Sequence, residues 1–273
     1  MCVLLANELT RLGHNVIIVS QNHYYWQKPF FKLDSKIKVL SMKRTICDYV
    51  ICKLFKRVKY DIRKYRRLLI ENSIQLIIDV DTEVSLCSVP ASDGLGIKII
   101  SWEHFCYQRF SHRAISHSIL DCIRNKVDKL VVLTKADYNH FILDANIPKD
   151  KVCQIYNPSP IEMSDYIPHN AKRVLAMGRL EYEKGFDLLL QAWAIVEEKN
   201  NNWQLEIVGD GSHREYLKNL CNSLNLKSVI FSPFTNTPID KYKNASVFAL
   251  SSRHEGLSLA LLEAANMSLP VVS

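Results

Sequence analysis

Short apolar runs alternate with longer amphipathic stretches along the whole chain. The runs are rich in Val, Ile and Leu, which is typical of buried strands, and the stretches between them show helical spacing of apolar residues. In the first half we expect strands at residues 16–20, 37–40, 75–79, 98–101, 129–133 and 152–155, with helices at 2–12, 48–72, 114–125 and 135–145. Because strands separated by helices pair in parallel, the pattern predicts an α/β fold with helices on both faces of parallel sheets.

The second half repeats this alternation. We expect strands at residues 173–177, 203–208, 228–231, 247–250 and 271–272, with helices at 185–198, 213–224, 239–244 and 257–266. The three prolines and polar residues of 157–171 are typical of a linker. We therefore expect two Rossmann-like domains that face a cleft: residues 1–160, a linker at 161–171, and residues 172–273. A chain of 273 residues is long enough for two cores.

Polar and glycine-containing segments follow three strands of the second half. They are Gly178 to Asp187, Gly209 to Gly211, and Ser251 to Ser258. The first amides of a helix lack internal partners, so those of Gly256, Leu257 and Ser258 could hold a phosphate.

Two carboxylates, Glu255 and Glu263, stand eight residues apart around the last helix start. A carboxylate accepts hydrogen bonds from two hydroxyls at once, which suits a sugar or ribose diol. The plainer interpretation is two solvated glutamates.

The order of these motifs resembles that of the family 4 (GT4) retaining glycosyltransferases of the GT-B type, as found in bacterial surface-polysaccharide synthesis. The resemblance is carried by residues 177–187 and 208–211, by the E-x7-E pair Glu255 and Glu263, and by 269–272. It covers nearly all of residues 172–273 and is looser over 1–160. It implies binding of a nucleotide-sugar donor by the second domain.

The resemblance also implies roles for single residues. Arg179 and Lys184 would bind the donor diphosphate, Glu263 the ribose hydroxyls, and Glu255 would face the donor sugar. Without the resemblance, two basic residues in a loop are more simply interpreted as solvated.

Three further residues would line the donor site by resemblance. Gly178 precedes the basic pair, Gly209 forms a tight turn after a strand, and Phe234 lies in the loop where the family binds the base. For Gly209, a purely structural turn is an equally good interpretation.

In the first domain, His104 follows a strand end within Trp102-Glu103-His104-Phe105. By resemblance His104 would touch the donor sugar, and Glu103 is a second candidate. An ordinary polar loop residue is the alternative interpretation of His104. Retaining members of the family show no agreed enzymatic nucleophile, so none is assigned.

The excess of positive over negative charge is confined to the first half. Residues 1–170 hold 24 Lys and Arg against 17 Asp and Glu, and residues 171–273 hold 11 of each, so the net charge of +7 belongs to the first half. Much of it lies in a basic amphipathic helix at residues 53–67. That helix is either a solvated face or a contact with an anionic membrane surface, where each basic residue contributes about 1 kcal/mol. No nucleic-acid-binding motif accompanies the charge.

The sequence predicts no metal site and no bound cofactor. Asp79 and Asp81 have the D-x-D spacing of manganese-dependent glycosyltransferases, but a strand-end turn is the better interpretation. The eight cysteines have no C-x-x-C spacing, and we find neither a signal peptide nor a membrane span. We expect a cytoplasmic protein, peripheral on the inner face of the cell membrane.

The chain opens with a helix, whereas an α/β domain normally begins with a strand. In the resembled family, a strand and a glycine-containing turn precede this helix, and further helices follow the position of Ser273. The resemblance therefore implies a chain truncated at both ends.

These observations predict an enzyme that moves a hexose or N-acetylhexosamine from a nucleotide-diphosphate sugar, with UDP as the expected nucleotide. The acceptor would be a glycan or a lipid-linked glycan in polysaccharide, lipopolysaccharide or capsule synthesis, and the anomeric configuration would be retained. One alternative is a non-catalytic subunit that binds nucleotide-sugar or a partner chain to complete its cleft. A sugar-nucleotide epimerase of the same fold is another.

Overall fold

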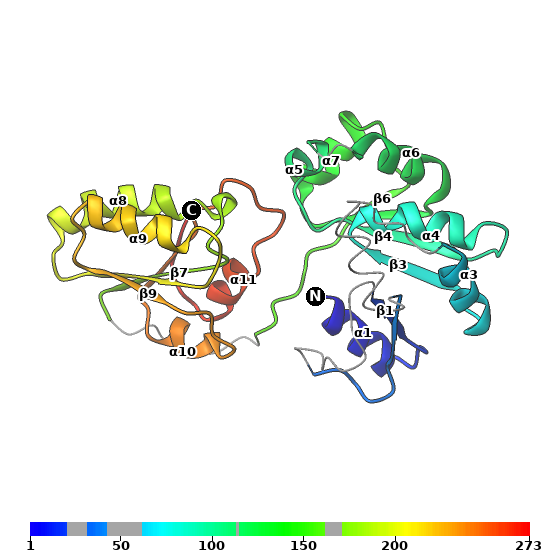
Figure 1. Cartoon of the computed structure of the whole chain (residues 1–273), viewed down its shortest axis with the longest axis horizontal. Coiled ribbons are helices and arrows are strands. Elements are labelled where there is room, and N and C mark those ends of the chain that lie inside the picture. Colours follow the sequence, from blue (N-terminus) through cyan, green and yellow to red (C-terminus); the bar gives the residue numbers. More distant parts are fainter. Residues whose placement is uncertain (21–31, 43–61, 113–114, 162–170) are drawn as a thin grey trace. The chain divides into compact units, whose positions relative to one another are not determined.

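The computed structural model describes residues 1–20, 32–42, 62–112, 115–161 and 171–273 (Figure 1). The chain forms two compact units, Met1–Tyr156 and Asn157–Ser273. Each unit contains parallel sheet with helices packed on it, so the predicted α/β class is confirmed. Most of the predicted linker lies outside the described residues.

The first unit holds two parallel sheets. Strands β1 (Ile17–Ser20) and β2 (Lys38–Ser41) pair with each other, and a four-stranded sheet has the order β3-β4-β5-β6. Its strands are β3 (Leu76–Val80), β4 (Lys98–Trp102), β5 (Lys129–Val132) and β6 (Val152–Gln154). The helices are α1 (Cys2–Arg11), α3 (Ile62–Glu71), α4 (Ser85–Ser92), α5 (Tyr107–Ser111), α6 (Ser116–Lys126) and α7 (Lys135–Leu143), with a short 3-10 turn η1 (Thr82–Val84).

Two helices of this unit, α4 and α5, were not expected from the sequence. Helix α4 contains three serines and Pro90, which are poor helix formers, so propensity alone argues against it. Its inward side chains Cys87 and Ala91 are buried in the core, and this tertiary burial stabilises the helix.

The basic helix expected at residues 48–72 is described only from Ile62 onward. Lys64 donates to the carbonyls of Ser41 and Met42 at the end of β2, at 3.0 and 2.9 Å. Arg66 donates to the carbonyls of Ala91 and Asp93 at the end of α4, at 3.1 and 2.7 Å. Two of the basic side chains are therefore bonded within the fold. Residues 53–59 lie outside the described part of the chain.

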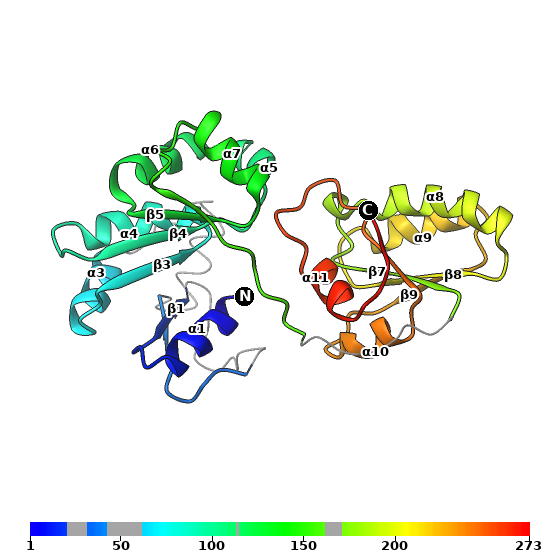
Figure 2. The same cartoon turned by 180° about the vertical axis from the view of Figure 1, so that it is seen from behind.

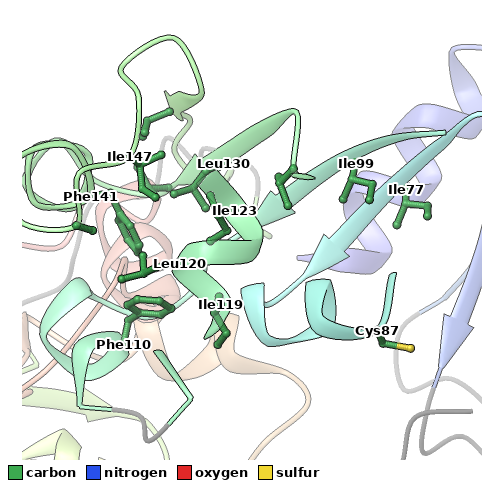
Figure 3. Packing of buried hydrophobic residues seen from close by; sticks show 14 of the residues in the cluster. Ile77, Cys87, Ile99, Phe110, Ile119, Leu120, Ile123, Leu130, Phe141 and Ile147 are labelled. Atoms are coloured by element: carbon green, nitrogen blue, oxygen red, sulfur yellow. The ribbon is translucent and has the colours of Figure 1, made fainter. Parts of the chain in front are cut away.

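An aromatic and aliphatic core holds the first unit together (Figure 3). The rings of Phe110 and Phe141 lie 5.2 Å apart, between centroids. They join helices α5 and α7, and the fully buried Ile119 and Ile123 of α6 belong to the same cluster. Burial of such side chains contributes about 1.5–3 kcal/mol each. This core fixes the strand ends from which Glu103 and His104 emerge.

The second unit is one five-stranded parallel sheet of order β11-β10-β7-β8-β9. The strands are β7 (Arg173–Met177), β8 (Gln204–Val208), β9 (Val229–Ser232), β10 (Val247–Ala249) and β11 (Val271–Val272). The helices are α8 (Phe186–Lys199), α9 (Arg214–Ser223), α10 (Pro238–Lys243) and α11 (Leu259–Asn266), with a 3-10 turn η2 (Tyr182–Lys184) before α8. The chain starts at the central strand β7, builds outward through β8 and β9, and then returns to place β10 on the other side of β7.

Helices cover both faces of this sheet (Figure 2), and each face has its own hydrophobic core. Helices α8 and α9 pack on one face, where Leu190 and Trp193 of α8 and Leu217 of α9 are buried. Helices α10 and α11 pack on the other face through Tyr242 and Ala264. The sheet is thus covered on both sides, which explains why most positions of its strands are apolar.

Candidate functional site

The strand order reverses between β7 and β10, because the chain leaves β7 in one direction and later returns on the other side. In doubly wound sheets, ligands bind at such a switch point, outside the carboxyl ends of the two strands. The segments there are residues 178–185 after β7 and 250–258 after β10. Arg179, Lys184 and Glu255, predicted as site residues, lie in these two segments. Topology alone therefore points to the same place as the motifs.

Lys184 and Glu255 form an ion pair, although 71 residues separate them. The Lys184 ammonium donates to Glu255 Oε1, and the Ser252 hydroxyl donates to the same oxygen at 2.9 Å. The two charged side chains are 22 and 23 % exposed, so solvent still reaches both. The structure thus brings together two residues for which the resemblance implies diphosphate and sugar contacts.

The segment 250–258 also donates hydrogen bonds to backbone carbonyls of the segment 178–185. The Ser251 hydroxyl donates to the Lys184 carbonyl at 3.0 Å, and the Arg253 amide donates to the Glu183 carbonyl at 2.8 Å. Gly185 has a φ of 62°, and a Cβ at this position would lie 2.0 Å from the Ser251 carbonyl oxygen. Only glycine permits this close approach.

A second ion pair, between Arg253 and Asp187, links the same segments. Arg253 Nη1 and Nη2 donate to the two carboxylate oxygens of Asp187 at 2.7 and 2.6 Å, and Nη1 also donates to the Tyr182 carbonyl at 2.9 Å. The hydrogen bond from Arg253 holds the pKa of Asp187 below its usual value. Sequence reasoning singled out neither side chain for this contact, because a pair 66 residues apart leaves no local signal.

Gly178 and Gly209 bring the ends of β7 and β8 into contact. Gly209 has a φ of 150°, and a Cβ there would lie 1.9 Å from the Gly178 carbonyl oxygen. The Gly178 amide donates to the Val208 carbonyl at 3.0 Å. Both glycines therefore serve backbone packing beside the site, and a donor contact for either stays a prediction.

Phe234 lies in the segment after β9, which Asp210 holds to the end of β8. The Phe234 amide donates to Asp210 Oδ2 at 3.0 Å, while Arg214 donates to Oδ1 at 2.8 Å. The Phe234 residue is 58 % exposed. Its predicted place in the base-binding loop stays a prediction.

The helix start after β10 differs from the one expected. Helix α11 begins at Leu259, two residues later than predicted, and Ser258 is its N-cap, accepting from the Leu261 amide at 3.4 Å. Serine favours this capping position because its side chain satisfies a helix-start amide. Gly256 and Leu257 belong to the preceding turn, so the expectation that their amides open the helix was wrong.

Glu263 lies on α11, and the Tyr242 hydroxyl of α10 donates to its Oε2 at 2.6 Å. Tyr242 is fully buried, so this bond anchors one carboxylate oxygen against the sheet. Burial raises the pKa of Glu263 above its usual value. The proposed contact of Glu263 with a ribose is not tested by this arrangement.

Arg179 is exposed directly after β7. Within the described residues, its guanidinium makes no hydrogen bond or ion pair in the structure. Its charge is therefore available to an anion at the switch point.

In the first unit, Glu103 and His104 follow β4. Glu103 is 1 % exposed, and its carboxylate accepts from the Thr82 hydroxyl at 2.5 Å and from the Phe105 amide at 2.9 Å. His104 packs on the Trp102 ring at 4.4 Å between centroids, and burial lowers the pKa of His104. Its buried Nε2 has no partner in the part of the chain that the structure describes. In a neutral imidazole, this nitrogen could donate a hydrogen bond to a hydroxyl or accept one from it, depending on the tautomer.

The D-x-D pair does not form a shared carboxylate site. Asp79 is 2 % exposed and accepts from the Ser85 and Ser88 hydroxyls at 2.9 and 2.5 Å, and burial raises its pKa to about 6. Asp81 instead caps η1 by accepting from the Glu83 amide at 3.3 Å. Among the described residues, no group of three or more His, Cys, Asp or Glu is placed to hold a metal ion.

Among residues 1–20, 32–42, 62–112, 115–161 and 171–273, no helix combines the length and apolar character needed to cross a bilayer.

Two protein-family models cover the chain. One, described as Glycosyltransferase Family 4, matches residues 1–162, and the other, described as Glycosyl transferases group 1, matches residues 162–273. The chain is 32% identical over 283 residues to an uncharacterized glycosyltransferase of Haemophilus influenzae, a match that covers 98% of this chain and 74% of the relative.

A second relative and a solved structure extend these findings. The chain is 27% identical to the GalNAc-alpha-(1->4)-GalNAc-alpha-(1->3)-diNAcBac-PP-undecaprenol alpha-1,4-N-acetyl-D-galactosaminyltransferase of Campylobacter jejuni, over 96% of this chain and 71% of the relative. The fold matches that of Anabaena Alr3699/HepE in complex with UDP-glucose, with a TM-score of 0.70, 15% identity, and coverage of 94% of this chain and 79% of that one.

The topology, the site motifs and the matches over both units agree with one another. The chain therefore belongs to glycosyltransferase family 4, and its architecture is of the GT-B type.

Proposed function

We propose that the protein transfers a hexose or N-acetylhexosamine from a UDP-sugar to a glycan or lipid-linked acceptor, with retention at the anomeric carbon. The observation that carries the proposal is the meeting of Lys184 and Glu255 at the switch point of the second sheet. Lys184 offers a cation that can bind a diphosphate, and the adjacent Glu255 offers a carboxylate that can bind sugar hydroxyls.

Departure of the nucleotide diphosphate requires stabilisation of the charge that builds on its oxygens. Lys184 and the exposed Arg179 supply two positive charges on one short segment after β7. Lys184 is held by Glu255, so its ammonium is already placed before a donor arrives. We assign charge stabilisation to this pair of cations, with no metal ion or other cofactor required.

Donor and acceptor are proposed from proteins similar to this chain. The solved Anabaena neighbour is a complex with UDP-glucose, which supports a UDP-hexose as donor. The Campylobacter relative is named for transfer of N-acetylgalactosamine to a glycan on PP-undecaprenol, which supports an aminosugar donor and a lipid-linked acceptor.

His104 is proposed to touch the donor sugar from the first unit. Its lowered pKa keeps the imidazole neutral near pH 7, so one ring nitrogen can accept and the other donate. No covalent role is assigned to it.

The proposal includes contact with an anionic membrane surface and a position on its cytoplasmic face. Arg63 and Arg67 of α3 are exposed, whereas Lys64 and Arg66 are bonded to backbone carbonyls. The contact therefore depends on these two arginines and on the basic residues of 53–59. Vesicle co-sedimentation with anionic and neutral lipids would test it.

The direct test compares Arg179→Ala and Glu263→Ala with the wild-type protein in a screen of nucleotide sugars, with nucleotide release as the readout. We expect kcat/KM to fall by about a hundredfold for Arg179→Ala, and the donor KM to rise for Glu263→Ala. Lys218→Ala, which removes a surface pair with Glu215 on α9, is the control. Unchanged kinetics in both variants would refute the site.

Two further outcomes separate the alternatives. UDP binding by calorimetry without release of UDP from any sugar donor would indicate a non-catalytic binding subunit. Activity that disappears with a chelator and returns with Mn²⁺ would contradict the metal-free assignment.

A further inference from the structure

Arg253 occupies a central position in the contact between the segments 178–185 and 250–258. Its guanidinium bonds both oxygens of Asp187 and the Tyr182 carbonyl, and its own amide donates to the Glu183 carbonyl. The Cζ atom also lies 4.2 Å from the centre of the Tyr182 ring. Arg253 therefore contacts three residues around Lys184, namely Tyr182, Glu183 and Asp187.

This arginine stands two residues before Glu255, and its partners flank Lys184 on both sides. Tyr182 and Glu183 precede Lys184, and Asp187 follows it at the start of α8. Arg253 is thus bonded on both sides of Lys184 and lies on the same short segment as Glu255. The Arg253 and Asp187 side chains are 18 and 17 % exposed, so most of their surface is covered by the protein.

We propose that Arg253, through its bidentate bond to Asp187, is a positioning residue that sets the distance between Lys184 and Glu255 for the donor's diphosphate and sugar. The inference rests on the proposed function of that site, and it gives Arg253 and Asp187 a positioning role rather than a donor contact. A planar guanidinium that bonds both oxygens of a carboxylate fixes the relative orientation of the two groups as well as their distance. Lysine has the same charge but no such planar group.

The test uses Arg253→Lys with a matched arginine elsewhere in the unit. Arg173 pairs with Glu206 at 3.1 Å at the amino end of β7, the opposite end of the sheet from the site. Arg173→Lys therefore controls for the general loss of a bidentate-capable arginine in an ion pair.

We expect Arg253→Lys to lower kcat by about tenfold or more, since misplacement of reacting groups by about 1 Å costs up to a hundredfold. The donor KM should change less, and Arg173→Lys should leave both constants unchanged. In a cycle with Asp187→Asn, the double variant should be no worse than Arg253→Lys alone, because each single change breaks the same contact. Additive losses, or unchanged kcat, would overturn the proposal.

Amide hydrogen exchange supplies a readout that does not need catalysis. Exchange in residues 250–258 should rise at least severalfold in Arg253→Lys and stay at the wild-type rate in Arg173→Lys. If the wild-type protein turned over no nucleotide sugar, the proposed function would fail while the exchange result still stood. If exchange in both variants matched the wild type, the positioning role would fail whatever the activity.

Discussion

The two units end their parallel sheets in different ways. At the carboxyl ends of β3 and β4, Asp79 and Glu103 are almost fully buried and bonded to hydroxyls of Ser85, Ser88 and Thr82. At the carboxyl ends of β7 and β10, Lys184 and Glu255 are paired across two segments and partly open to water. Similar strand ends therefore carry closed polar networks in one unit and open charged pairs in the other.

The difference shows how one topology serves two purposes. A carboxylate that is almost fully buried and bonded within its own fold is shielded from a ligand, and acts mainly on stability. In an ion pair that solvent still reaches, each group can exchange its partner for a ligand more readily than in a closed network. Substitutions at the strand ends of the first unit should therefore change mainly stability, and substitutions at those of the second unit should change mainly catalysis.

The largest expected effect is on catalysis at the open end. Lys184→Ala should lower kcat by about a hundred- to a thousandfold, because it removes a charge that we propose stabilises the departing diphosphate. Its thermal unfolding should stay close to that of the wild type, since the ion pair with Glu255 is partly exposed. Steady-state kinetics and calorimetry check the two parts. If Lys184→Ala instead unfolded at a much lower temperature than the wild type, the contrast between the two sheet ends would be lost.

The next effect is on stability at Gly185, and it separates the contribution of close backbone packing from that of a left-handed backbone conformation. Gly185→Ala places a Cβ 2.0 Å from the Ser251 carbonyl oxygen, so the two segments must move apart. We expect a loss of about 3 kcal/mol in the free energy of unfolding. Gly96→Ala is the matched control: its φ of 68° is close to the 62° of Gly185, but nothing lies within 4 Å. It should cost only about 1 kcal/mol. Equal losses in denaturant unfolding would show that the contact with Ser251 contributes nothing.

The smallest effect concerns pH at the closed end. The pKa of Asp79 is raised from 3.8 to about 6 by burial, so the folded state binds this proton more tightly than the unfolded state. The free energy of unfolding should therefore fall by about 1 kcal/mol between pH 5 and pH 7 through this group. Asp79→Asn keeps an oxygen for Ser85 and Ser88, and should remove this part of the pH dependence.

Urea unfolding at the two pH values measures it, and Asp93→Asn, at an exposed aspartate of the same unit, is the control. An unchanged pH dependence in Asp79→Asn would mean that this carboxyl titrates alike in the folded and unfolded states.

Much of the fold follows from local pattern. The long apolar strands and regular helices were placed to within one or two residues, as for β7 and α9, because burial on both faces leaves a continuous apolar run. Helices α4 and α5 were missed, since serines, a proline and short length hide a helix that the core stabilises. The start of α11 was placed two residues early because Leu257 fits the apolar run that Ser258 in fact caps.

The sequence by itself determined the α/β class, the order of the described strands and of most helices, and the segments that carry Arg179, Lys184, Glu255 and Glu263. Those features depend on neighbouring residues, whose spacing is visible along the chain. Only the tertiary structure decided three contacts. Lys184 forms an ion pair with Glu255, Arg253 bonds both carboxylate oxygens of Asp187, and the buried Asp79 accepts hydrogen bonds from serine hydroxyls. These contacts join residues from different elements, and their geometry depends on strand order and packing, which no local pattern encodes.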